Sequence, residues 1–118
     1  MRIDIVLPWP PSVNHYFVHT RRGAFLSPAA RAYRLLVCAA ARDANAPELV
    51  GDVRLDIMAA APDNRRRDLD NVLKGLLDAI QHAGIYADDF QVSDLRIRRA
   101  GVVPGGSLAV MIQGTAKK

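Results

Sequence analysis

The sequence has little cysteine, no long apolar run and few lysines. A single cysteine, Cys38, stands among 118 residues, which excludes an internal disulfide framework and fits a reducing, intracellular setting. No apolar segment approaches the ~20 residues needed to cross a membrane. The first residues, MRIDIVLPWP, have an aspartate and prolines where a signal peptide has its apolar core. We therefore expect a cytoplasmic protein with no membrane partner.

What the sequence does have is arginine. Thirteen arginines and three lysines give a formal net charge of +4 at pH 7. The guanidinium fork binds phosphate oxygens well, so clustered arginine in a basic chain favours nucleic acid as a partner. The alternative is a GC-rich genome, whose codons favour arginine and alanine. Half of the residues are hydrophobic, enough for the core of one domain over residues 1–118.

Hydrophobic periodicity predicts two helices and four strands. Ser27 and Pro28 mark a helix start, and the apolar spacing that follows predicts a helix over 28–43. A second apolar stripe begins near residue 69 and ends before Gly84, which is typical of a helix with a glycine C-cap. Alternating apolar residues predict strands at 2–7, 52–61, 90–99 and 107–114.

The order of these elements predicts an α+β fold. Strand, helix, strand, helix, strand, strand suggests a small mixed or antiparallel sheet with two main helices packed on it. The last two strands are joined by a hairpin-length turn, so we expect them to run antiparallel. The segment 8–14 contains three prolines and is expected to end the first strand. A loop is expected to follow through 19–25, with Gly23 at its turn.

The densest charge lies in NRRRDLDN, residues 64–71, where three arginines precede two aspartates. Asp68 is expected at or just before the start of the second helix, and Asp70 in its first turn. Two helical residues two apart point about 200° away from each other. Asp68 and Asp70 can converge on one ion only because Asp68 lies at the junction before the helix. The free N–H groups there also favour negative charge.

Further polar residues follow this motif. Lys74 is four residues after Asp70, on the polar face of the helix. Asp88 and Asp89 follow the turn that ends the helix, so the chain has a short route to bring one of them back toward the sheet. Three carboxylates and a lysine beside arginines predict a divalent-metal site, because hard oxygen ligands suit Mg²⁺ or Mn²⁺. Each of these features also has a structural alternative when it is considered alone. An aspartate at the helix start can cap the helix, and Asp70 and Lys74 can form an ion pair along it. Asp88 and Asp89 can be turn residues.

Such a set suits the hydrolysis of a phosphodiester. The reaction needs an activated water and a stabilised leaving oxygen, and divalent ions held by carboxylates supply both. A lysine can balance charge in the transition state. Arg65, Arg66 and Arg67 would hold backbone phosphates that the carboxylates would otherwise repel. Arg21 and Arg22, in a loop with Gly23, form either a second phosphate clamp or a solvated turn.

At these residues the sequence resembles the RusA family of Holliday-junction resolvases, small endonucleases often carried by phages and prophages. The resemblance covers nearly the whole chain and rests on three ordered blocks. They are LPWPPSVNHYF (7–17), PDNRRRDLDNVLKGLLDAI (62–80) and AGIYADDFQV (83–92).

The resemblance implies a homodimeric, Mg²⁺-dependent crossover junction endodeoxyribonuclease. Such an enzyme nicks four-way DNA junctions in paired, symmetric cuts during recombination, repair or phage DNA processing. A two-fold dimer would offer two equivalent sites to two equivalent strands. The implied metal-binding catalytic residues are Asp68, Asp70 and Asp89, with Asp88 able to assist or replace Asp89, and Lys74 as the catalytic lysine. The competing hypothesis is a basic dimeric nucleic-acid-binding module without cleavage activity.

Aromatic residues and one glycine leave alternatives open. Trp9, His15, Tyr16 and Phe17 either stack on bases at an opened junction centre or cover the end of the sheet or a dimer seam. Gly75 is unfavourable inside a helix by about 1 kcal/mol relative to alanine. We therefore expect it at a close-packing position, with a partner subunit as one possible neighbour.

Overall fold

The computed structural model describes all of residues 1–118. None of its helices combines the length and the apolar character needed to span a membrane. Its elements, in chain order, are strand β1 (Arg2–Leu7), helix α1 (Val13–Tyr16), strands β2 (Phe17–Thr20) and β3 (Gly23–Leu26), helix α2 (Pro28–Asp43), strand β4 (Leu49–Ala60), helix α3 (Asp70–His82), the 3₁₀ helix η1 (Asp89–Gln91), and strands β5 (Val92–Arg99) and β6 (Ser107–Ala116).

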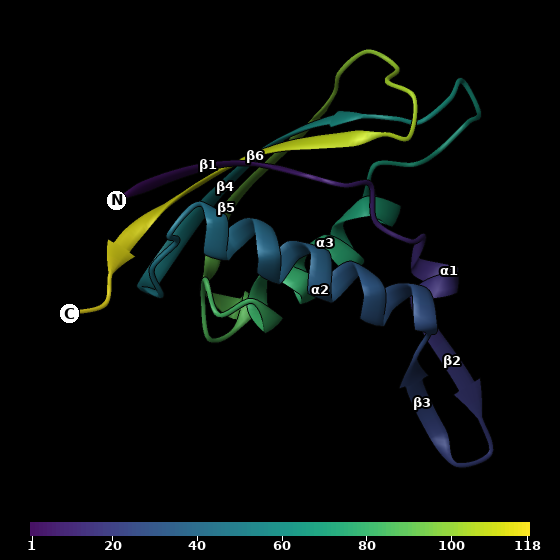
Figure 1. Cartoon of the computed structure of the whole chain (residues 1–118), viewed down its shortest axis with the longest axis horizontal. Coiled ribbons are helices and arrows are strands. Elements are labelled where there is room, and N and C mark those ends of the chain that lie inside the picture. Colours follow the sequence, from purple (N-terminus) through teal and green to yellow (C-terminus); the bar gives the residue numbers. More distant parts are fainter.

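Four strands form one mixed sheet in the order β1-β6-β4-β5. β6 pairs antiparallel with both β1 and β4, whereas β5 pairs parallel with β4. The helices α2 and α3 lie on the same side of this sheet (Figure 1). The predicted α+β fold, with two main helices packed on a mixed sheet, is therefore confirmed.

The core lies between the sheet and these two helices. Alternate residues of β1, β4 and β6 are buried, as period-2 patterning requires. The apolar stripe of α3 and a line of small and aromatic residues on α2 complete the core. Its largest fully buried side chains are Tyr16, Tyr86, Leu7, Leu49, Leu55, Ile57, Leu76, Ile80, Ile85, Leu108, Ile112 and Val37.

The last two strands run in opposite directions, as predicted, but they are not neighbours. β4 lies between them, and β5 forms an edge of the sheet. β5 follows β4 through the α3 crossover, which places it parallel to β4. β6 has its apolar residues at alternate positions and takes the inner place beside β4, whereas β5 is largely exposed. The connection between Arg99 and Ser107 is long enough to cross over β4.

The predicted loop through 19–25 forms most of a β-hairpin, and the short helix α1 precedes it. β2 and β3 pair antiparallel, with Phe17 opposite Leu26 and Thr20 opposite Gly23. This hairpin projects from the body of the molecule (Figure 1). Gly23 has a backbone φ of +122°, a value that L side chains rarely adopt, so the prediction of a turn at this glycine is correct. Strands of four residues give too short an alternation to be recognised in the sequence.

Tyr16 ties α1 to α3. Its side chain is fully buried, and a Cβ added at Gly75 would lie 2.9 Å from both Cδ2 and Cε2 of its ring. The Tyr16 hydroxyl donates a hydrogen bond to Asp78. Arg34 of α2 donates to the same carboxylate through Nε and Nη2, each at 2.9 Å. Gly75 is thus a close-packing position, and its neighbour belongs to the same chain.

We expect Gly75→Ala to destabilise the fold. The added methyl group must displace the Tyr16 ring, which costs about 1–3 kcal/mol, while alanine improves helix propensity by about 1 kcal/mol. The expected net loss in unfolding free energy is up to about 2 kcal/mol, measured by chemical denaturation. Gly101→Ala is the matched control, because a Cβ there meets no atom within 4 Å. Equal stability of the two variants would contradict the packing argument.

The carboxylate of Asp78 should make stability depend on pH. Burial raises the pKa of Asp78, but the Arg34 guanidinium and the Tyr16 hydroxyl outweigh burial and hold this pKa below its ordinary value of 3.8. A depressed folded-state pKa stabilises the fold above the ordinary value, and this contribution is lost as the pH falls below it. Both side chains of the pair are about a quarter exposed, so we expect Asp78→Asn to cost about 1–3 kcal/mol at pH 7.

The measurement is the unfolding free energy of wild type and Asp78→Asn between pH 7 and pH 3. The difference between them should shrink as the pH falls through the ordinary value of 3.8 and below it, because the unfolded chain takes up a proton there before the folded carboxylate does. Asp43→Asn, an exposed position of α2 without an ion pair, should match wild type throughout. A constant difference at every pH would show that the charge of Asp78 does not stabilise the fold.

Candidate functional site

The start of α3 holds two of the predicted ligands. Leu69 is the N-cap residue and Asp70 the first helical residue. Asp68 lies just before them, and its backbone oxygen accepts from the N–H of Asn71 at 3.2 Å. No side chain caps this helix end, so the alternative in which Asp68 serves as a helix cap does not describe this structure. Asp70 lies in the first turn, where the helix dipole favours negative charge.

The predicted ligands are carboxylates without a cationic partner. Six of the twelve acidic residues form ion pairs with lysine or arginine. Lys74 is exposed and forms no ion pair, so the structural Asp70–Lys74 pair is not made. Four of the six acidic residues left unpaired are those predicted to bind metal; the full set is Asp43, Asp52, Asp68, Asp70, Asp88 and Asp89.

The two pairs of aspartates are attached to opposite ends of α3. The backbone N–H of Asp89 donates to Oε1 of Gln81 at 3.1 Å, in the last turn of the helix. Gln81 follows Asp70 by eleven residues, or about 16 Å along a helix axis. Within one chain, no group of three or more His, Cys, Asp or Glu side chains is placed to hold a metal ion. The structure therefore does not bring Asp68, Asp70 and Asp89 together in a single chain.

Asp88 and Asp89 differ in what their side chains do. Asp88 is the N-cap of η1, and its Oδ1 accepts from the N–H of Phe90 at 2.8 Å. Oε1 of Gln91 accepts from the N–H of Asp88 at 3.2 Å, which completes a capping box. The Asp89 side chain is exposed and makes no such bond. The geometry thus favours Asp89 over Asp88 as a ligand.

The arginine run is organised by Asp63, which the sequence analysis did not single out. Its carboxylate accepts from Nη1 of Arg67 at 2.6 Å, and from the backbone N–H and Nη2 of Arg65 at 2.9 and 3.1 Å. These bonds, that to Arg67 first, hold the pKa of Asp63 well below its usual range. Arg66 is exposed and has no carboxylate partner. The three arginines are therefore not equivalent, and Arg66 is the one whose guanidinium is free for a phosphate. The signal in the sequence was Asp63-Asn64-Arg65, which is typical of a turn closed by an aspartate side chain.

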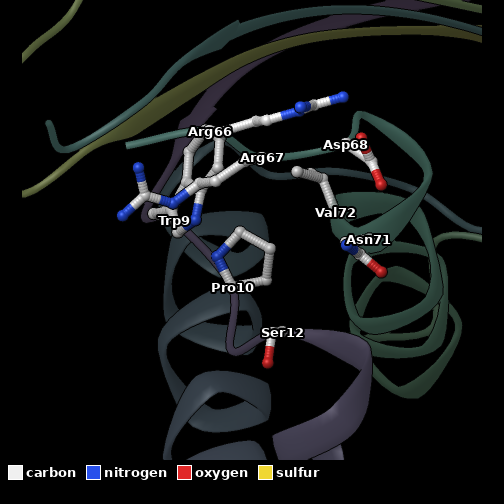
Figure 2. A pocket seen from close by; sticks show the side chains of 8 residues that line it. All are labelled: Trp9, Pro10, Ser12, Arg66, Arg67, Asp68, Asn71 and Val72. Carbon is white, nitrogen blue, oxygen red and sulfur yellow. The ribbon is translucent and has the colours of Figure 1, made fainter. Parts of the chain in front are cut away.

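A pocket of about 430 Å³ opens beside Asp68 (Figure 2). Three segments form it: the proline loop after β1, the arginine loop before α3, and the first turn of α3. Trp9 and Val72 supply its apolar wall. The lining residues are Trp9, Pro10, Ser12, Arg66, Arg67, Asp68, Asn71 and Val72.

Arg21 and Arg22 lie away from this pocket in sequence and in the fold. They form the exposed turn between β2 and β3, at the tip of the projecting hairpin (Figure 1). Neither is part of an ion pair. The hairpin gives this predicted clamp a defined support, which a loop would not.

Comparison with known proteins places the chain among DNA endonucleases. A family model described as Endodeoxyribonuclease RusA matches residues 8–113. The chain is 44% identical over 112 residues to the crossover junction endodeoxyribonuclease RusA of Enterobacteria phage HK97, covering 92% of each chain. It is 41% identical over 110 residues to the protein of that name from Escherichia coli K12, again covering 92% of each. Against that of Enterobacteria phage 82, it is 40% identical over 109 residues, covering 92% of this chain and 91% of the relative.

These matches show both the class of protein and its family. The class is that of the endodeoxyribonucleases, which confirms the prediction of an endonuclease. The chain belongs to the RusA family.

Proposed function

We propose that this protein is a Mg²⁺-dependent endonuclease that resolves four-way DNA junctions by paired, symmetric nicks. The observation that carries the proposal is the set of unpaired carboxylates beside a free arginine, in a chain whose relatives bear the name crossover junction endodeoxyribonuclease. We propose that the enzyme acts in the cytoplasm and that its substrate is junction DNA. The proposed process is recombination and repair or phage DNA processing.

The residues present suit a hard divalent ion. Asp68, Asp70 and Asp89 offer exposed carboxylate oxygens, the ligand type that Mg²⁺ prefers and Mn²⁺ accepts. Such an ion, when bound, activates water and stabilises the leaving oxygen. Lys74, one turn along α3 from Asp70 and without a partner, would balance the charge that develops on the phosphate. Arg66 would hold a neighbouring backbone phosphate.

A homodimer explains how separated carboxylates serve one site. Each chain carries Asp68 and Asp70 at one end of α3 and Asp89 at the other. If two copies pair about a two-fold axis with their α3 helices antiparallel, the first turn of one helix meets the last turn of the other. Two equivalent sites then form, each with Asp68 and Asp70 from one subunit and Asp89 from its partner. Two such sites match the two equivalent strands of a junction.

The first test is cleavage of a labelled four-way junction by wild type and Asp70→Asn. Loss of one ligand carboxylate should lower the nicking rate by about 10²–10³-fold, while junction binding is retained. Wild type should need Mg²⁺ or Mn²⁺, be inhibited by EDTA, and leave a linear duplex of the same sequence uncut. Asp43→Asn, which also removes an unpaired exposed carboxylate, should cut normally. Wild-type binding without cutting under either metal would favour the non-catalytic binding module.

The second test separates a shared site from one formed within a chain. Asp70→Asn and Asp89→Asn are each expected to be inactive alone. Mixed after subunit exchange, they form heterodimers in which one site holds both substitutions and the other holds neither. The mixture should regain single-strand nicking to about a quarter of the wild-type rate, since half of the dimers carry one intact site.

Restored nicks should be unpaired, because only one strand meets an active site. A mixture that stays inactive, with heterodimers present by native mass spectrometry, would overturn the shared site and leave the ligands to be assembled within one subunit. The same mixture made with Asp70→Asn and Asp68→Asn is the matched control. These residues lie at the same end of α3, so no complementation is expected.

A further inference from the structure

We propose that the pocket beside Asp68 receives one unpaired nucleobase of the strand that is cut, stacked on Trp9 and read at its edge by Asn71 and Arg66. This inference rests on the proposed function, because the substrate must be a DNA junction. It adds a binding subsite, and it names the chemistry that would select the position of the cut.

The pocket has the size and the wall of a nucleobase site. Its volume of about 430 Å³ lies at the lower end of the range for small-molecule sites, about 300–1,000 Å³. That space is sufficient for one nucleobase. The Trp9 side chain lines it, with Pro10 and Val72 nearby (Figure 2). Enzymes that take a base out of a duplex hold it against aromatic and apolar side chains in this way.

Trp9 is fixed in place by the loop between β5 and β6. A Cβ added at Gly106 would lie 2.7 Å from Cβ and 3.1 Å from Cγ of Trp9, and 3.2 Å from Cδ of Pro62. Gly106 also has a φ of +75°. Glycine is therefore required both for the space beside Trp9 and for the backbone conformation. Only part of the Trp9 side chain is buried against the core. A rigid aromatic side chain that keeps an exposed part in a pocket is suited to stacking.

The polar groups of the pocket are free to bind a ligand. Asn71, Arg66 and Asp68 make no side-chain hydrogen bond within the chain, although all three line the pocket. By contrast, Arg67 is held by Asp63. Asn71 offers one donor group and one acceptor, and Arg66 offers donors only. Both are side chains that read base edges in protein–DNA complexes, asparagine at adenine and arginine at guanine.

An unpaired base links the pocket to junctions. Extruding a base from an intact duplex costs a few kcal/mol, and the cost is least where the base is already unpaired. At the centre of a four-way junction the continuous stacking of the duplex is interrupted, so a base there should be easier to extrude than one inside a duplex. With Asp68 in the pocket wall, a base held there belongs to a nucleotide next to the proposed metal ligands. The pocket would therefore set both the preference for a branch point and the nucleotide at which the strand is cut.

The experiment measures affinity for abasic junctions without divalent metal, so that it does not depend on cleavage. The crossover-proximal nucleotides of a four-way junction are replaced one at a time by an abasic site. On the intact junction, Trp9→Ala should weaken binding by about 5- to 150-fold, and Trp9→Phe should recover most of this loss. At one abasic position, and only there, Trp9→Ala and wild type should bind within about twofold of each other.

Two further variants keep the test decisive. Gly106→Ala displaces the Trp9 side chain without removing it, and it should reproduce the position-dependent loss of Trp9→Ala. Leu36→Ala, at an exposed apolar side chain of α2, should bind every junction as wild type does. Circular dichroism and thermal unfolding establish that each variant is folded.

An equal loss for Trp9→Ala on every junction of the series would overturn the base pocket. Failure of wild type to cut would instead count against the proposed function, and the affinities would still decide whether a base is bound. In the cutting reaction, with Mg²⁺ and junctions that differ in the bases at the crossover, Asn71→Ala should flatten the dependence of the rate on base identity. An unchanged dependence would remove Asn71 from base reading.

Discussion

The arrangement of the helices depends on the interactions of one carboxylate, that of Asp78. It lies on α3 and binds the Arg34 guanidinium of α2 and the Tyr16 hydroxyl of α1. Tyr16 also fills the space that Gly75 leaves open. Because α1 follows directly after the proline loop, fixing α1 on α3 also fixes one wall of the pocket beside Asp68. A largely buried ion pair that does not line the pocket thus positions the candidate site.

The distribution of ion pairs separates the carboxylates that support the fold from those that we propose as metal ligands. Asp63 holds Arg65 and Arg67, so part of the arginine run supports its own loop. On the face of the sheet away from the helices, further carboxylates pair with arginines of β1, β4 and β5. The aspartates at the two ends of α3 have no such partner. A net-positive chain that leaves these carboxylates unpaired keeps them available for a cation that it does not itself supply.

Local signals in the sequence predict the bounds of α2 correctly, because capping and helix periodicity are local properties. Ser27 caps α2 through a hydrogen bond from the N–H of Ala30, and the predicted helix over 28–43 has the observed bounds. The pairing of β5 could not be predicted, because a connection of hairpin length can also cross a neighbouring strand. Likewise, the sequence predicts Asp70 at the start of the second helix and Asp89 after its end, but it does not show whether the chain returns Asp89 to the helix start. The Asp63-Asn64-Arg65 pattern indicates a turn, but it does not show that the Asp63 side chain binds the guanidinium groups of Arg65 and Arg67.

The length of α3 connects the two proposals. Asp68, Asp70 and Asn71 lie at its start, so the proposed metal ligands and the proposed base-reading amide are positioned by the same rigid element. Its last turn holds Asp89 through Gln81. If the partner supplies Asp89, the metal site is complete only in the dimer, whereas the base pocket is complete in each chain. Binding of a base can then precede assembly of the metal site, and a monomer on duplex DNA would lack the ligands to cut it. Selectivity for a two-fold symmetric branch would follow from geometry, since only that substrate fills both pockets and both sites at once.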